Sequence, residues 1–137
     1  MTRFRALCGG ILAAGALLLS GSGVAQAQEA RAYPGNWMYV AVMQGEEALG
    51  NVSGTLVRCP QGGGGHPHGK QACKELAAVG GDITRMKPRT GVMCPMIYQP
   101  VTAMAYGVWN GHRKVYSMTF SNPCVLKNAT GSVFGLR

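Results

Sequence analysis

Four cysteines between residues 59 and 124 could either form disulfides or bind zinc. They are Cys59, Cys73, Cys94 and Cys124. Zinc sites often use C-x-x-C pairs, which this sequence lacks, so we expect no bound metal at the cysteines. The fifth cysteine, Cys8, would be removed with the N-terminal signal peptide described below. An even number of cysteines in an exported chain favours two disulfides, and the sequence alone leaves three pairings open. If the pairing is sequential, each bridge should stabilise the fold by roughly 3–4 kcal/mol.

The segment 91–100 (GVMCPMIYQP) combines large apolar side chains with two prolines. Those apolar side chains are Met93, Met96, Ile97 and Tyr98. Pro95 and Pro100 disfavour an ordinary central strand, and Pro95 also biases Cys94 toward extended geometry. If Cys94 is bridged to Cys124, the segment becomes a stiff, extended, apolar loop, the kind of strand that a protease cleft recognises. The alternative, which the pattern alone favours, is a core strand beside a disulfide.

Two other patterns point to chemistry that we do not expect here. Gly62 to Gly65 resemble a phosphate-binding loop, but the required G-K-[ST] ending is replaced by Gly69-Lys70-Gln71, which argues against nucleotide binding. His66 and His68 could bind a metal ion only with a third ligand. In this glycine-rich, flexible loop we expect both to be solvent-exposed. The serines have no recognisable catalytic signature, so the sequence predicts neither an enzyme nor a cofactor.

The N-terminus has the pattern of a secretory signal peptide. A basic start, an apolar stretch and a small-residue cleavage site follow one another as Arg3 and Arg5, residues 6–19, and Ala25-Gln26-Ala27. Gly, Ser and Gln interrupt the apolar stretch well before the ~20 residues needed to span a membrane. We therefore expect cleavage after Ala27, removal of residues 1–27, and a secreted, single-domain protein over 28–137 with no membrane attachment.

The formal net charge of +8 falls to +6 when Arg3 and Arg5 are removed. Most remaining basic residues are scattered, which favours a solvated surface and no nucleic-acid partner. One alternative is a secreted protein that binds polyanions or metal through a short cluster, Arg85, Lys87 and Arg89, together with the two loop histidines. A purely structural exported domain is another alternative.

The hydrophobic pattern predicts an α+β domain. Strands are expected over 37–43, 52–58, 101–108 and 113–120, with Asn110-Gly111 as a hairpin turn. Residues 71–79 should form a short helix that ends at Gly80-Gly81, and residues 121–124 a turn. Residues 132–134 could add an edge strand. The prediction is thus an antiparallel sheet of about five strands with one or two short helices and two disulfides.

Several separated blocks resemble the Streptomyces subtilisin inhibitor family of secreted serine protease inhibitors, over nearly all of residues 36–137. The matching blocks lie in residues 72–82, in VMCPMIY over 92–98, in GVW over 107–109, in FSN over 120–122 before Cys124, and around 132–134. The resemblance implies the pairing Cys59–Cys73 and Cys94–Cys124. It also implies a homodimer joined through its sheets.

The same resemblance implies a reactive bond between Met96 and Ile97. Met96 would enter the primary specificity pocket of a subtilisin-like or chymotrypsin-like target, and Ile97 would lie on the leaving side. The flanking contact loop would comprise Gly91, Val92, Met93, Cys94, Pro95 and Tyr98, the first three of them pairing with the enzyme as an added strand. The implied function is inhibition of secreted subtilisin-type proteases, with no catalytic residue of its own.

Overall fold

The computed structural model describes residues 35–46 and 50–137. The predicted signal peptide, residues 1–27, lies outside the described residues. No helix in the described part of the chain is long and apolar enough to cross a membrane.

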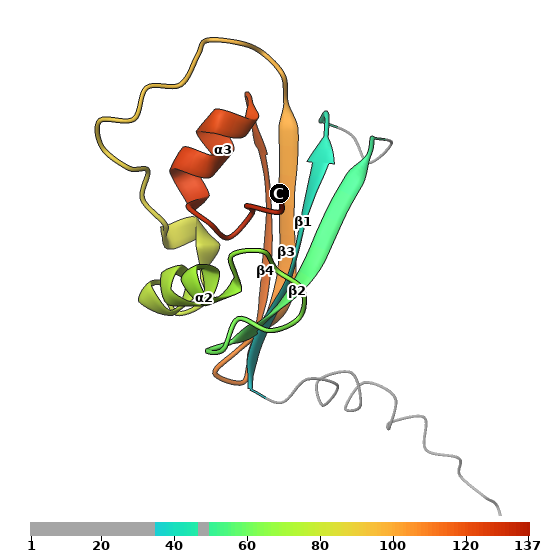
Figure 1. Ribbon diagram of the computed structural model, residues 1–137, viewed down its shortest axis with the longest axis vertical. Coiled ribbons are helices and arrows are strands. Elements are labelled where there is room, and N and C mark those ends of the chain that lie inside the picture. The colour runs from blue at the N-terminus through green and yellow to red at the C-terminus, as the bar shows by residue number, and fades with distance from the viewer. Residues whose placement is uncertain (1–34, 47–49) are drawn as a thin grey trace, which may run out of the picture.

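A four-stranded antiparallel sheet forms one layer of the fold (Figure 1). Its strands are β1 (Asn36–Gln44), β2 (Val52–Cys59), β3 (Val101–Trp109) and β4 (His112–Phe120), arranged in the order β2-β1-β3-β4. Each strand lies within one residue of its predicted bounds. The predicted hairpin also forms: Asn110 and Gly111 have φ values of 49° and 79°, the left-handed geometry that type I′ turns require.

Two helices form the second layer and cover the same face of the sheet (Figure 1). Helix α2 (Gly69–Ala78) overlaps the predicted helix and is followed by a 3₁₀ turn, η1 (Ile83–Arg85). Helix α3 (Pro123–Thr130) begins where the sequence predicted only a turn. The expectation of one or two short helices is therefore confirmed, although the position of the second helix was not predicted.

The core lies between the two layers, because alternate residues of the central strands point toward the helices. Its largest fully buried side chains are Met38, Val40, Val57, Leu76, Val101 and Val133. The disulfide Cys59–Cys73 links the end of β2 to α2, with the Cα atoms 5.4 Å apart. This bridge ties the helical layer to an edge strand of the sheet.

The prediction of a fifth strand is wrong for the described residues, because residues 132–134 form a turn after α3. The backbone N–H of Ser132 donates to the Glu75 carboxylate on α2 at 2.6 Å, so a side chain uses it and not a neighbouring strand. Val133 and Phe134 are nevertheless buried. Their apolar character, which suggested an edge strand, reflects packing of a turn into the core.

The prediction that both loop histidines are solvent-exposed is wrong for His66, which is buried. Its Nε2 lies 3.0 Å from the Val133 carbonyl, and its Nδ1 accepts a hydrogen bond from the His68 backbone N–H at 3.0 Å. These two bonds require a neutral ring protonated on Nε2. Burial lowers the pKa of His66, which favours the same neutral form. His66 thereby fixes the glycine-rich loop to the C-terminal segment.

Candidate functional site

Residues 86–100 form a long loop, without helix or strand, that runs from η1 to β3 beyond α3 (Figure 1). The large apolar side chains of this loop face solvent: Met96 is fully exposed at 105% of its reference area, and Met93 is 95% exposed. Ile97 and Tyr98 are also exposed. The alternative of a core strand is therefore wrong. An exposed cluster of large apolar side chains is typical of a binding surface.

The first anchor of this loop is the disulfide Cys94–Cys124, with the Cα atoms 5.6 Å apart. Cys124 is the second residue of α3, so the bridge attaches the loop to the first turn of a packed helix. It holds the main chain two residues before Met96. Both disulfides thus join the cysteines that the resemblance paired.

The second anchor is the side-chain amide of Asn122, which is buried just before α3. Its Nδ2 donates two hydrogen bonds, to the Pro95 carbonyl at 3.1 Å and to the Ile97 carbonyl at 3.0 Å. Its Oδ1 accepts from the Val125 N–H at 3.0 Å and so caps the helix. One buried amide therefore fixes the backbone on both sides of Met96 while it starts α3.

Asn122 was not among the predicted site residues. A signal for part of its role was present, since Asn followed by Pro is a common beginning of a helix, with Asn as N-cap and Pro at the first helical position. That signal locates α3, yet it does not reveal the two bonds across to the loop. Those bonds depend on the fold, which brings residues 25 and 27 positions earlier in the chain beside the amide.

Further hydrogen bonds hold the two ends of the loop. The Gln99 N–H donates to the Ser121 carbonyl at 2.8 Å. The Arg89 N–H donates to Oδ1 of Asn128 at 3.1 Å, and the Arg89 guanidinium lies 3.7 Å from the Glu75 carboxylate. The loop is thus anchored near both ends as well as beside Met96, so its exposed side chains are carried on a fixed backbone.

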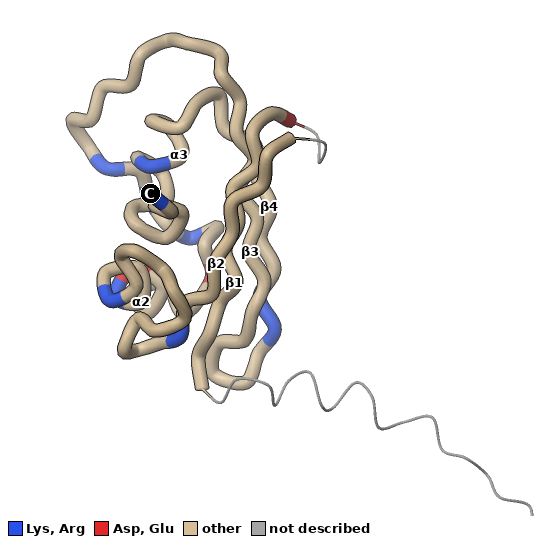
Figure 2. Tube along the Cα trace, turned by 45° about the vertical axis from the view of Figure 1, so that its right-hand side comes forward, with Lys and Arg blue, Asp and Glu red and all other residues tan. Residues whose placement is uncertain are grey.

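The remaining predicted contact residues lie on the N-terminal part of the loop. Gly91 has a φ of 76°, a conformation that a residue with a side chain would adopt only with strain. Val92 and Met93 follow outside the sheet, exposed to solvent. Residues 91–100 carry no charged side chain, and Figure 2 shows the apex of the loop free of Lys, Arg, Asp and Glu. This surface suits an apolar cleft better than a charged one.

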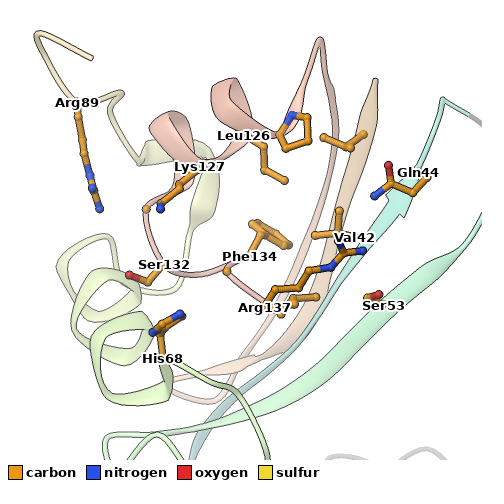
Figure 3. Close-up of a pocket in the computed structure, with 15 residues that line it drawn as sticks. Val42, Gln44, Ser53, His68, Arg89, Leu126, Lys127, Ser132, Phe134 and Arg137 are labelled. Atoms are coloured by element: carbon orange, nitrogen blue, oxygen red, sulfur yellow. The ribbon is translucent and has the colours of Figure 1, made fainter. Parts of the chain in front are cut away.

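A cavity of about 390 Å³ lies between α3, the C-terminal segment and the sheet (Figure 3). Arg89, Lys127 and Arg137 are among the residues that line it, whereas residues 91–98 are not. A partner that binds the loop would therefore do so on the outer surface. Within the described residues, no group of three or more His, Cys, Asp or Glu side chains could hold a metal ion.

Comparison with known sequences gives a consistent set of matches. The profile of the family described as subtilisin inhibitor-like matches residues 35–122. A Streptomyces avermitilis protein, named as a candidate serine protease inhibitor, is 47% identical over 131 residues, covering 96% of this chain and 86% of that protein. The subtilisin inhibitor of Streptomyces albogriseolus is 45% identical over 80 residues, covering 58% of this chain and 56% of that inhibitor.

A solved structure gives a match in three dimensions. The chain is similar to Streptomyces caespitosus sermetstatin, in a crystal structure of its complex with Bacillus licheniformis subtilisin. The TM-score is 0.61 at 35% sequence identity, and the match covers 72% of this chain and 96% of the solved one. At this level of identity and TM-score, the fold is shared.

Proposed function

Since the chain belongs to the subtilisin inhibitor-like family, we propose that it inhibits subtilisin-type serine proteases. It would present the peptide bond Met96–Ile97 to the protease in the manner of a substrate, and the inhibitor would hold both sides of that bond in place after the attack. The family is one of protease inhibitors and not of enzymes. The observation that carries the proposal is the combination of a fully exposed Met96 side chain with a backbone that Asn122 fixes on both sides.

The exposed side chain of Met96 would fill the primary specificity pocket of the protease. Its unbranched, flexible thioether suits a roomy apolar pocket. It offers no cation to the acidic pocket of trypsin-like enzymes, so we expect subtilisin-like and chymotrypsin-like targets to be preferred. Residues 91–93 would pair with the protease as an added strand, which uses main-chain hydrogen bonds for affinity.

The anchors explain how attack by the protease would be contained. The catalytic serine attacks the Met96 carbonyl carbon, and the oxyanion hole stabilises the developing charge. If the peptide bond breaks, the Cys94–Cys124 bridge retains the acyl side and the Asn122 bond to the Ile97 carbonyl retains the new amine. The amine therefore stays beside the acyl-enzyme at high effective concentration and can re-form the bond before water enters.

The same anchors favour tight binding. Because the loop is extended and fixed before it meets the protease, little conformational entropy is lost on association. An interface of about 1,600 Å² is usual for complexes between proteases and inhibitors, and at that size affinity depends more on preorganisation than on area.

Titration of subtilisin with the purified mature protein, followed by mass spectrometry of the complex, tests this proposal. We expect stoichiometric inhibition and a single cut between Met96 and Ile97. Met118→Ala serves as a matched control, since Met118 is a half-exposed methionine on β4, outside the loop. Full subtilisin activity at excess inhibitor, or cleavage at another bond, would contradict the assignment of the loop.

The open face of the sheet supports the proposal of a homodimer. This face carries Trp37 and Tyr39 of β1 and Tyr106 of β3, which is 54% exposed. On the two edge strands, Val52 of β2 and Val115 of β4 are 54% and 82% exposed. An apolar surface of this kind on a folded domain marks an interaction site. A second copy is the occupant we propose, because the rings of Tyr39 and Tyr106 already contact each other, with their centroids 5.3 Å apart, on a preformed surface.

Light scattering on wild type and Val115→Arg measures that assembly. A dimer in wild type and a monomer in the variant are expected. Val92→Arg, which places the same charge on the loop, should leave the mass unchanged. A wild-type monomer at high concentration would exclude the dimer.

Export is the last part of the proposal. If residues 1–27 are removed as a signal peptide, the protein recovered from the culture medium should begin at Gln28. N-terminal sequencing of that protein checks both the secretion and the cleavage site.

A further inference from the structure

The two most exposed methionines of the described chain lie three residues apart on the same loop. Met96 and Met93 are 105% and 95% exposed, whereas Met38 and Met43 on β1 are 1% and 5% exposed. Oxidation of methionine by peroxide follows the access of the oxidant to the sulfur. All cysteines of the described residues are in disulfides, so no thiol there competes for a peroxide. The loop thioethers are therefore the most accessible oxidisable groups of this structure.

We propose that Met96 is an oxidation site through which hydrogen peroxide switches the inhibitor off. The sulfur lone pair attacks one peroxide oxygen, the O–O bond breaks and an S–O bond forms. The sulfur loses two electrons, and the second peroxide oxygen leaves with the proton of the first as water. The products are methionine sulfoxide and water, and no further reactant is needed. This proposal rests on the proposed function, in which the side chain of Met96 enters an apolar pocket.

The sulfoxide should weaken binding because it places a strong hydrogen-bond acceptor where an apolar group was required. A polar group that is buried without a partner loses its hydration without compensation. We expect the inhibition constant for subtilisin to rise on the order of 10- to 100-fold. The loop itself should keep its shape, since Asn122 contacts the backbone at Pro95 and Ile97 and not the oxidised side chain.

The test treats the mature protein with hydrogen peroxide, removes the oxidant by desalting, and then maps oxidised peptides and titrates subtilisin. Met96 and Met93 should gain one oxygen before Met38 and Met43 do, and inhibition should weaken in step with Met96. Met96→Leu, titrated before and after treatment, should give the same inhibition constant both times. Met118→Leu is the matched control, since Met118 is a half-exposed methionine on β4 outside the loop, and it should lose inhibition as wild type does. Methionine sulfoxide reductase should restore the treated wild type.

The outcomes separate this inference from the proposed function. If untreated protein fails to inhibit subtilisin, the proposed function is wrong and the switch falls with it, whatever the peptide map shows. If untreated protein inhibits, but oxidation of Met96 leaves the inhibition constant unchanged, only the switch is wrong. Equal loss of inhibition in treated Met96→Leu and wild type would assign the effect to another methionine and would also overturn it.

Discussion

The two disulfide-bridged loops of this protein are fixed in opposite ways. In the glycine-rich loop, His66 is a loop side chain that turns inward and bonds the Val133 carbonyl of the body. In the 86–100 loop, Asn122 is a body side chain that reaches outward and bonds the carbonyls of the loop. A loop fixed through its own side chains buries them, whereas a loop fixed through its backbone leaves its side chains free for a partner. The second arrangement is the one that a substrate-like inhibitor needs.

The largest expected effect comes from a change of the free side chain itself. Met96→Lys should weaken subtilisin inhibition by about 100-fold or more, because an unpaired ammonium would enter an apolar pocket. It should improve inhibition of trypsin, whose pocket is acidic. Since Met96 is fully exposed, the melting temperature should not change. Inhibition constants against both proteases, with Met118→Lys as control, measure this, and no change in either constant would refute the assignment of Met96.

The two disulfides can be removed separately, so that the anchoring of each loop is tested by itself. Their sequence separations of 14 and 30 residues predict losses of about 3 and about 4 kcal/mol in the free energy of unfolding in the chain-entropy model. The double variant Cys94→Ala/Cys124→Ala should also convert the inhibitor into a substrate that subtilisin cleaves and releases. Cys59→Ala/Cys73→Ala should be destabilised but still inhibit below its melting temperature. Denaturant unfolding and timed inhibition assays separate the two results.

Two substitutions separate the two roles of the Asn122 amide, which caps α3 and holds the loop. Asn122→Ala removes both the helix cap and the loop bonds, and should lower the free energy of unfolding by about 2 kcal/mol. Asn122→Ser keeps an oxygen that can cap α3, but a hydroxyl is too short to reach both loop carbonyls. Both variants should therefore lose subtilisin inhibition over time as the loop is cleaved, while only Asn122→Ala loses the cap. Equal persistence of inhibition in wild type and Asn122→Ser would contradict the anchoring role.

The sequence predicted the parts of this molecule that local patterns control. Runs of apolar, β-branched and aromatic residues, one of them alternating, located all four strands, and Asn110-Gly111 located the hairpin. The proline-flanked apolar residues around Met96 indicated a candidate loop, although the residue pattern alone favoured a core strand. The family resemblance favoured the exposed loop over the core strand, and it also implied which cysteines are paired.

The sequence could not predict contacts that depend on tertiary packing. Residues 132–134 have the apolar character of a strand, yet Glu75 binds the Ser132 N–H and holds a turn. His66 has the surroundings of an exposed residue, yet its loop folds back over the C-terminal segment. Asn122 acts on residues far from it in the sequence. In each case long-range hydrogen bonds hold the observed arrangement, and no local pattern encodes such bonds.

The smallest expected effect concerns the inward-fixed loop and depends on pH. Because the pKa of His66 is lowered in the fold, the unfolded chain, with an ordinary value near 6.5, binds the proton more readily than the folded chain does. The free energy of unfolding should therefore fall as the pH drops below about 6.5 toward the folded pKa. Burial is the main cause that lowers this pKa, and the nearby His68 lowers it further, whereas the hydrogen bond to Val133 and the charge of Glu75 raise it.

His66→Gln removes this titration. It should cost about 1 kcal/mol at pH 7 through its weaker hydrogen bonds, and it should make the melting temperature less dependent on pH between 7 and 5 than in wild type. Subtilisin inhibition at pH 7 should be unchanged, because both hydrogen bonds of the His66 ring go to residues outside the 86–100 loop. His68→Gln is the control, since it removes the neighbouring histidine and leaves the buried imidazole in place. Parallel curves of melting temperature against pH for wild type and His66→Gln would show that protonation of this ring is not linked to folding, and the contrast between the two loops would then rest on geometry alone.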